Sequence, residues 1–187
     1  MSANPTDDDA KAQLLELIHE HAIIDGGDFE LASGAHSSLY VDLRRVSMHP
    51  EGASLIGAML APRLARLGIT AVGGMATAAI PVVSAVVIAS ARTDHPIRGF
   101  YVRDKAKTRG TQRQIEGQLR KGDKVALVED TMTTGGSTMT AVEAVRAQGC
   151  EVVQVITVVD RQKGGAELYA KAGIPFDALI TLDEITG

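Results

Sequence analysis

The sequence is 187 residues long and carries a net charge of −4, with 45% hydrophobic residues and only 3% aromatic residues. This length suits one α/β domain with a core of Val, Ile, Leu and Ala, and the negative charge argues against a general nucleic-acid or membrane-surface binder. The single cysteine excludes an intrachain disulfide and a Cys-rich metal site, and no apolar run is long enough to cross a membrane, so we expect a cytoplasmic protein.

Two helices are predicted in the first third of the chain. Apolar residues recur at helical spacing in residues 10–24 and again in residues 52–67. His19 and His21 lie two positions apart in the first helix and therefore face different directions, which argues against a metal site. Pro62 falls inside the second helix and is expected to kink or split it, because proline has no backbone N–H to donate.

A β-hairpin is predicted between these helices. Residues 29–34 and 37–44 are two short alternating segments around a turn rich in Gly, His and Ser. The hairpin is either a plain edge feature or a cover for the main sheet in which Ser33, Gly34 and Tyr40 line a pocket. The pattern alone favours the edge feature.

A strand, a run of small residues and a buried helix come next. Residues 69–74 are typical of a short strand, residues 75–81 are mostly small, and residues 82–91 form an apolar run long enough for a helix. Small residues after a strand allow a ligand to approach backbone N–H groups, but close helix-to-strand packing explains them equally well. Residues 97–103 predict a further strand.

A row of basic residues follows this strand. Its members occupy every second position and fall on one side of an extended chain: Arg103, Lys105, Lys107 and Arg109. Like charges at this spacing repel one another unless water or a polyanion screens them. The row therefore predicts either a solvated loop or a segment that binds a polyanion such as pyrophosphate. A nucleic-acid patch ranks third, because aromatic stacking partners are few.

The stretch with the clearest chemistry is residues 125–149. An apolar strand ends in Glu129 and Asp130, and a loop of Thr, Gly and Ser residues, 131–138, leads into a helix that ends at Gly149. We call residues 131–138 the phosphate loop, because the free N–H groups and the dipole of a helix N-terminus attract anions. The loop lacks the Lys of a Walker motif and the spacing of a dinucleotide fingerprint. The adjacent acids suit sugar hydroxyls, or water on a divalent cation, so the pattern indicates a ribose 5-phosphate site; an ordinary strand-to-helix turn is the alternative.

The last third predicts a buried strand with a basic residue at its end. Residues 151–160 are apolar on both faces, which is typical of an interior strand of a parallel sheet. Arg161 then lies on the same edge as the phosphate loop and suits a carboxylate or a planar polar ring; a surface ion pair with Asp160 or Glu167 is the alternative. Two further elements complete the prediction, a short helix at residues 164–172 and a strand at residues 177–182.

The alternation of strands and helices predicts a doubly wound α/β fold with its ligand at the carboxyl edge of the sheet. The sequence VEDTMTTGGS at residues 128–137 resembles the phosphoribosyl-pyrophosphate (PRPP) signature of type I phosphoribosyltransferases. Further motifs resemble the orotate phosphoribosyltransferases of that family, in the same order along nearly the whole chain: FxLxSG at 29–34, SxxYxD at 37–42, RxxAKxxG at 103–110 with IEG at 115–117, and VDRxxGGAE at 159–167. The resemblance implies the type I phosphoribosyltransferase fold, a central, mostly parallel sheet flanked by helices, in a single domain. A small N-terminal hood is formed largely by residues 1–48 and the core by residues 49–187.

The resemblance also implies roles for individual residues. The resemblance implies that Glu129 and Asp130 hold the ribose hydroxyls and that residues 131–137 of the phosphate loop bind the 5-phosphate. The PRPP-binding residues implied are Arg103, Lys107, Arg109, Glu129, Asp130, Thr131, Met132, Thr133, Thr134, Gly135, Gly136 and Ser137. Those implied in catalysis are Lys107, Arg103 and Asp130, and those implied in orotate binding are Thr133 and Arg161.

The implied activity is transfer of the 5-phosphoribosyl group from PRPP to orotate, which gives orotidine 5′-phosphate and pyrophosphate in de novo pyrimidine biosynthesis. Mg²⁺ is the implied cofactor, held mainly by PRPP and water with no direct protein ligand. A homodimer with shared active sites is the implied assembly, in which the basic loop closes partly across the interface. No nucleic acid or membrane is expected as a partner.

This sequence departs from the family pattern at a few positions. Asp104 and Arg109 stand where the family usually carries Lys and His, and Ala32 and Ala78 stand where some members carry Lys. The contacts with pyrophosphate are therefore expected to be distributed differently. Two other functions stay open: a phosphoribosyltransferase for another nucleobase, which Arg161 disfavours, and a non-catalytic PRPP-sensing regulator, which would need neither Arg161 nor the basic row.

Overall fold

The computed structural model describes residues 7–30, 36–104 and 114–187. The predictions for Ala32, Ser33, Gly34, Lys105, Lys107 and Arg109 lie outside the described residues. Within the described ranges, no helix is long and apolar enough to cross a membrane.

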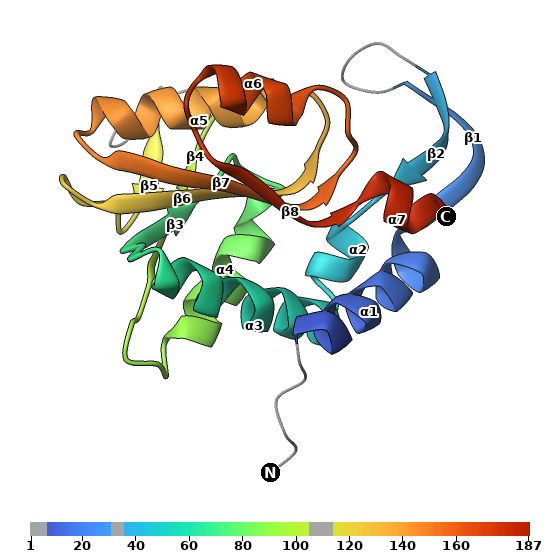
Figure 1. Ribbon diagram of the computed structural model, residues 1–187, viewed down its shortest axis with the longest axis horizontal. Coiled ribbons are helices and arrows are strands. Elements are labelled where there is room, and N and C mark those ends of the chain that lie inside the picture. Colours follow the sequence, from blue (N-terminus) through green and yellow to red (C-terminus); the bar gives the residue numbers. More distant parts are fainter. Residues whose placement is uncertain (1–6, 31–35, 105–113) are drawn as a thin grey trace.

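A six-stranded sheet forms the centre of the molecule (Figure 1). Its strands are β3 (Ala71–Gly73), β4 (Arg98–Val102), β5 (Ile115–Gly117), β6 (Lys124–Met132), β7 (Glu151–Asp160) and β8 (Phe176–Thr181). They lie in the order β5-β4-β3-β6-β7-β8, and every neighbouring pair is parallel except β4 and β5. The mostly parallel sheet is confirmed, and β7 is the interior strand that its apolar run predicts.

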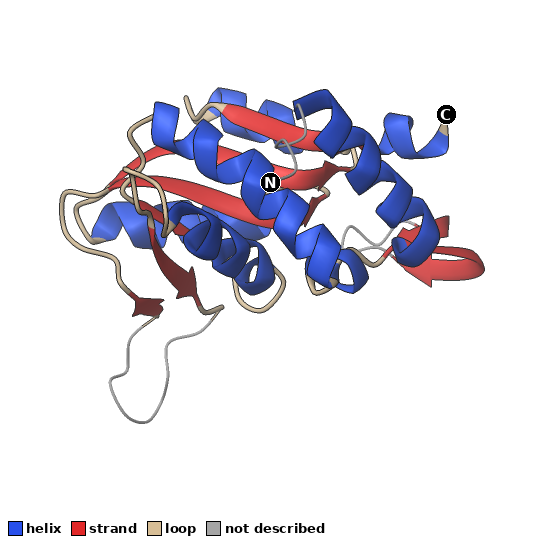
Figure 2. Cartoon of the chain, turned by 90° about the horizontal axis from the view of Figure 1, so that it is seen from below, coloured by secondary structure: helices blue, strands red, loops and turns tan. Residues whose placement is uncertain are grey.

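Helices cover both faces of this sheet (Figures 1 and 2). One face carries α5 (Gly136–Ala147) and α6 (Gly165–Lys171), and the other carries α1 (Asp7–Leu17), α3 (Pro50–Arg66) and α4 (Ala79–Ser90). Successive strand residues alternate between the two cores, because side chains along a strand point to opposite faces. Leu127 and Val155 join the core under α5, whereas Val128 and Ile156 join the core under α3 and α4.

A smaller layer lies at one end of the main sheet (Figure 1). It contains η1 (Ile18–Ala22), β1 (Ile23–Glu30), β2 (His36–Val41) and α2 (Arg44–Ser47). β1 and β2 pair antiparallel as a separate two-stranded sheet, so the predicted hairpin is confirmed, although its first strand begins at Ile23 rather than at residue 29. The buried side chains of Val41, Leu43 and Val46 join the core of α1 and α3 and fix the layer to the rest of the molecule.

The prediction that Pro62 splits its helix is wrong. α3 runs without a break from Pro50 to Arg66. Pro62 is exposed and lies between the buried residues Ala61 and Leu64, whose packing holds this turn in place despite the missing N–H donor. The sequence analysis also did not predict three short elements, which are α2, β5 and α7 (Leu182–Thr186).

Candidate active site

The two acidic residues lie within β6. This strand extends to Met132, beyond the acids at which the prediction ended it, so both acids belong to a paired central strand, and Glu129 lies opposite Thr157 of β7. Their side chains point to opposite faces. Glu129 contacts Thr138 of α5, whereas Asp130 faces residues of the smaller layer.

The phosphate loop joins β6 to α5, as predicted. Gly135 adopts a left-handed conformation with φ of 81°, and α5 begins at the next residue. The buried Tyr169 of α6 donates a hydrogen bond from its hydroxyl to the Gly135 carbonyl oxygen at 2.9 Å. A Cβ atom at Gly135 would lie 2.9 Å from the same hydroxyl oxygen, so this close approach requires glycine. Gly136 and Ser137 are exposed at the start of α5, where the free N–H groups suit an anion.

Both acids ionise less readily than usual. Burial raises the pKa of Glu129 to about 7, and the charge of Asp130 acts in the same direction, while a hydrogen bond donated by the Thr138 hydroxyl opposes both effects. Burial also raises the pKa of Asp130, although its Oδ1 accepts a hydrogen bond from the Thr131 N–H at 2.7 Å. A ligand whose hydroxyl groups donate hydrogen bonds to these carboxylates would stabilise their charged forms.

A cavity of about 320 Å³ opens beside Asp130. Five of its lining residues come from β2, α2 and the turn between them, and we call them the hood wall: Tyr40, Val41, Asp42, Leu43 and Arg44. Four others come from the carboxyl ends of β6 and β7 and from the phosphate loop, and we call them the sheet wall: Asp130, Thr131, Thr133 and Arg161. Ala78, which lies between β3 and α4, completes the lining. The hairpin is thus more than an edge feature, since Tyr40 lines the cavity as one of the two interpretations predicts.

Arg161 is buried in the sheet wall. It is only 5% exposed, and its backbone N–H donates to the Met132 carbonyl oxygen at 2.9 Å. Burial lowers the pKa of its guanidinium, while Tyr40 acts in the opposite direction. This burial argues against the alternative of a surface ion pair. Thr133 and Arg161, from two different segments, therefore line the same cavity, as expected for residues that bind one ligand.

The residue after Arg161 is tied to the last helix. Gln162 has a positive φ of 55°, and its side-chain amide both donates to Asp183 Oδ2 at 3.1 Å and accepts from the Asp183 N–H at 3.2 Å. The helix α7 that carries Asp183 begins with a capping box between Thr181 and Glu184. Glu184 also pairs with Lys11 of α1, with 2.7 Å between Oε1 and Nζ. The position of Arg161 therefore depends on α7 as well as on β7.

Asp42 and Arg44 are cavity residues that the sequence analysis missed. Arg44 Nε donates to Asp42 Oδ1 at 2.7 Å, and this pair lines the hood wall. A signal was present in the sequence, because Tyr40, Asp42 and Arg44 alternate in the predicted strand and so share one side of it. Their polarity on one side of an apolar segment could have indicated a ligand-facing edge.

Comparison with known proteins places this chain in the family that its motifs resemble. A family model described as phosphoribosyl transferase domain matches residues 52–177. The orotate phosphoribosyltransferase of Streptomyces avermitilis is 45% identical over 179 residues, which cover 95% of this chain and 98% of that protein. The enzyme of the same name from Corynebacterium glutamicum is 43% identical and covers 99% of this chain and 98% of its own length. The chain belongs to the orotate phosphoribosyltransferase family.

A solved structure of an orotate phosphoribosyltransferase extends this agreement to the fold. The Mycobacterium tuberculosis protein in complex with PRPP has a TM-score of 0.80 and 36% identity, and the match covers 95% of this chain and 99% of that one. The type I phosphoribosyltransferase fold and the resemblance noted from the motifs are therefore confirmed. In this family member, the structure brings together Asp130, the phosphate loop and Arg161 at one edge of the sheet.

Arg103 has contacts different from those of the other predicted site residues. It follows β4, its Nη2 donates to Tyr101 Oη at 3.1 Å, and its guanidinium lies 5.4 Å from the centre of the Tyr101 ring. Its Nε is 3.8 Å from Glu116 Oε1. Arg103 does not belong to the described lining of the cavity, so the structure holds it at the base of the basic row rather than beside Asp130.

The described residues include no group of three His, Cys, Asp or Glu side chains that could hold a metal ion. Asp42 and Asp130 nevertheless face the same cavity, and the charge of Asp42 raises the pKa of Asp130. Two carboxylates this close offer oxygen atoms to the water shell of Mg²⁺, which usually keeps several of its waters. The residues present therefore fit a hydrated magnesium ion that the substrate itself chelates.

Proposed function

We propose that the protein transfers the 5-phosphoribosyl group of PRPP to orotate, giving orotidine 5′-phosphate and pyrophosphate in de novo pyrimidine biosynthesis. The observation that carries the proposal is one cavity lined by the phosphate loop, by the acidic residue Asp130 and by the buried Arg161. A sugar phosphate and an anionic planar base each find a matching group there. A single domain, with a hood of residues 1–48 and a core of residues 49–187, carries this site.

The sugar phosphate binds at the end of β6. Free N–H groups at the start of α5 and the hydroxyls of the phosphate loop hold the 5-phosphate. Glu129 and Asp130 accept hydrogen bonds from the ribose hydroxyls, which stabilise the ionised carboxylates against the effect of burial. The residues assigned to PRPP are Glu129, Asp130, Thr131, Met132, Thr133, Thr134, Gly135, Gly136 and Ser137, together with Arg103, Lys107 and Arg109.

Orotate binds beside the sugar. The guanidinium of Arg161 pairs with the orotate carboxylate, because its planar fork matches two carboxylate oxygens. Its burial strengthens that pairing, since water competes less for a buried charge. Thr133, which lies in the phosphate loop, contacts the same base from the sugar side of the cavity.

The reaction proceeds by charge stabilisation and alignment. The C1–pyrophosphate bond of PRPP breaks with both electrons leaving on pyrophosphate, the ribose passes through an oxocarbenium-like state, and N1 of orotate forms the new bond to C1. Asp130, beside the ribose, stabilises the developing positive charge, and Arg103 and Lys107 stabilise the leaving group. Magnesium chelated by the diphosphate supplies further charge neutralisation when it is bound, with Asp42 and Asp130 facing its water shell.

The assembly proposed is a homodimer with shared active sites in the cytoplasm. Arg103 begins the basic row after β4, and it is not one of the residues that line the cavity. The basic row of one subunit would then close over the pyrophosphate bound by the other. Sedimentation of the purified protein, and activity of mixtures of a Lys107→Ala subunit with an Asp130→Asn subunit, would test the sharing: recovered activity is expected only if one site uses both subunits.

A spectrophotometric assay of orotate consumption with PRPP and Mg²⁺ tests the activity. Consumption that depends on both substrates is expected, with no transfer to adenine or hypoxanthine. Transfer to a purine in place of orotate would favour the alternative of a different base, and binding of PRPP without transfer would favour a PRPP-sensing regulator. Arg161 argues against both, because a neutral purine and a sensor alike have no need of a buried guanidinium.

A further inference from the structure

The hood wall carries a cation of its own, which nothing in the proposed reaction yet uses. Arg44 lines the cavity, and its side chain is 55% exposed. Asp42 holds it through a 2.7 Å bond from Arg44 Nε, and this contact raises the pKa of the guanidinium. The bond engages Nε, and among the described residues neither terminal nitrogen of Arg44 donates a further hydrogen bond. Arg44 and Asp130 line the same cavity from its two walls, and the charge of Arg44 partly opposes the rise that burial causes in the pKa of Asp130.

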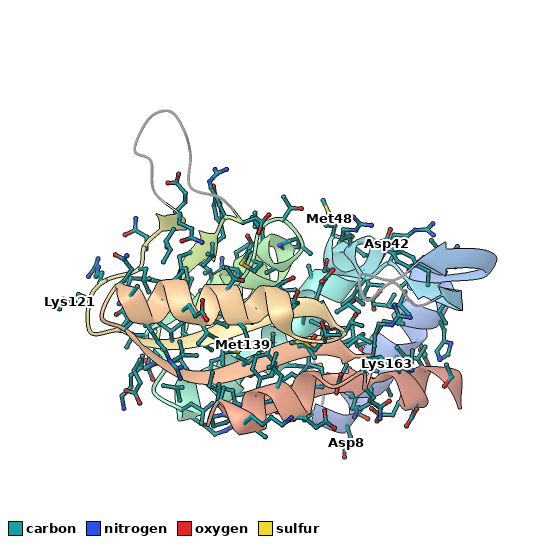
Figure 3. The ribbon with its side chains drawn as sticks, turned by 90° about the horizontal axis from the view of Figure 1, so that it is seen from above. Asp8, Asp42, Met48, Lys121, Met139 and Lys163 are labelled. Carbon is teal, nitrogen blue, oxygen red and sulfur yellow. The ribbon has the colours of Figure 1, made fainter. Side chains whose placement is uncertain are left out.

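Arg44 and Arg161 approach the cavity from different sides. Arg161 follows β7, whereas Arg44 begins α2, which packs on α4, the helix that starts directly after Ala78. In the sheet order, β3 and β7 lie on opposite sides of β6, so Ala78 and Arg161 flank Asp130 from either side. Figure 3 shows Asp42 and Met48, which flank α2, on the side of α4, and Lys163 near β8 on the other side.

The side of the cavity near Arg44 and Ala78 has a small side chain and one guanidinium, which Asp42 holds through Nε. Ala78 contributes only a methyl group to the lining, and it precedes the twelve-residue helix α4 in a turn where Thr77 is exposed. Arg161 already serves the base on the far side. The ligand left for this side is the part of the activated sugar that points away from the base, which is its diphosphate.

We propose that Arg44 binds the diphosphate of PRPP and the pyrophosphate product, and that Asp42 orients its guanidinium. The proposal rests on the proposed function, since it assigns one end of the substrate of that reaction. The terminal nitrogens of a guanidinium match two phosphate oxygens, and Asp42 fixes the plane in which they point. Arg44 then supplies from the hood the charge that the small side chain at Ala78 does not.

Titration of inorganic pyrophosphate with Mg²⁺ into the whole protein tests this directly. Arg44→Gln is expected to weaken pyrophosphate binding by about tenfold, the lower end of the range for a charged hydrogen bond because the side chain is half exposed. Arg44→Lys should lose about threefold, because an ammonium keeps the charge without the paired donors. The matched control is Arg45→Gln, since Arg45 is the exposed neighbour in α2 but does not belong to the cavity lining, and it should bind as the unchanged protein does.

Steady-state kinetics supply the second readout. The KM for PRPP should rise in parallel with the pyrophosphate dissociation constant, while the KM for orotate stays within about twofold. A rise in the KM for orotate with unchanged pyrophosphate binding would overturn the proposal and place Arg44 beside the base. Equal pyrophosphate affinity in Arg44→Gln and Arg45→Gln would also overturn it. If the unchanged protein bound pyrophosphate but consumed no orotate, the proposed function would fail while the titration still decided the role of Arg44.

Discussion

The sheet wall and the hood wall of the cavity are held in different ways. Asp130 and Arg161 are buried at the ends of two long paired strands, and Tyr169 and Thr138 fix the phosphate loop and Glu129 from behind. In the hood wall, Arg44 is half exposed at the start of a helix of only four residues, and Asp42 is the residue that orients it among those that the structure describes.

The two walls bind different parts of the substrate, and they differ in rigidity. Phosphate, ribose and base contact residues whose positions the central sheet determines. The diphosphate, which must leave after each turnover, contacts a side chain that can move without disturbing the core. Substitutions in the residues that support the sheet wall from behind should therefore change both affinity and stability, whereas those in the hood wall should change affinity alone.

The largest effect is expected from Asp130→Asn. Loss of the carboxylate removes charged hydrogen bonds to the ribose, so kcat/KM should fall by about 100-fold or more in the orotate assay. The fold should tolerate the change, because burial already disfavours the ionised form of Asp130. The matched control is Asp42→Asn in the hood wall, for which a fall of less than about tenfold is expected. A larger effect at Asp42 than at Asp130 would reverse the comparison of the two walls.

Arg161→Ala should act on the base alone. Removal of a charged hydrogen bond worth about 1.5–3 kcal/mol should raise the KM for orotate by roughly 10- to 150-fold and leave the KM for PRPP nearly unchanged. Lys163→Ala, at an exposed position two residues on, serves as the control and should leave both constants unchanged. Normal orotate affinity in the Arg161 variant would remove this residue from the base site.

Gly135→Ala tests the support behind the phosphate loop. The new Cβ would meet Tyr169 Oη at 2.9 Å in a left-handed backbone, so urea unfolding should show a loss of about 2 kcal/mol. Gly136→Ala offers a sharp contrast, since its Cβ would meet nothing within 4 Å and alanine favours a helix over glycine by about 0.5–1 kcal/mol. The two neighbouring substitutions are thus expected to change the free energy of unfolding with opposite signs.

The pH dependence of stability and of the KM for PRPP should report the ionisation of Glu129. Its folded pKa of about 7 lies above the ordinary glutamate value of 4.5, so the ionised form is disfavoured in the folded state. The resulting stability is fully present below about pH 4.5 and is lost as the pH rises through about 7. The KM for PRPP should run the other way and fall between pH 6 and pH 8 by up to roughly tenfold, because the carboxylate form accepts the ribose hydroxyls. Glu129→Gln should flatten both profiles, whereas Glu143→Gln on the exposed side of α5 should leave them as they are.

The smallest effect is expected from Tyr169→Phe. The ring stays stacked on Phe176, with centroids 5.5 Å apart, but the hydrogen bond to the Gly135 carbonyl oxygen is lost. Urea unfolding should show a loss of about 1 kcal/mol, and the KM for PRPP should rise by a few-fold as the phosphate loop loosens. An unchanged KM would show that the glycine geometry alone holds the loop.

Much of the sheet wall could be predicted from the sequence, because local patterns specify it. The apolar run of β7 and the acids that precede the Thr and Gly residues of the phosphate loop lie close together in the chain, and parallel strands bring their carboxyl ends to one edge. The positive φ of Gly149 after α5 was likewise visible as a helix-ending glycine. The motif resemblance then added the identity of the ligands.

The hood wall and the short elements could not be predicted in the same way. α2 has four residues and β5 has three, too few for any periodicity to be recognised. The alternation of Tyr40, Asp42 and Arg44 marks a polar side of the hairpin, but it does not show what that side faces. Asp42 and Arg44 line a cavity with Asp130, which depends on contacts between distant parts of the chain. The helix α7 was different, since the capping box of Thr181 and Glu184 is a readable signal that the sequence analysis overlooked. At Pro62, tertiary packing outweighed a local rule.

The paired hydrogen bonds between Gln162 and Asp183 have a consequence for the order in which the protein assembles during synthesis. The phosphate loop and its partner Tyr169 precede Asp183 in the chain, so they leave the ribosome before it does. The segment after Arg161 forms its hydrogen bonds with Asp183 only after residue 183 has emerged. The ion pair between Lys11 and Glu184 likewise forms only after residue 184 has emerged. The phosphate loop can therefore reach its final structure before the segment that holds Arg161, the residue assigned to the base.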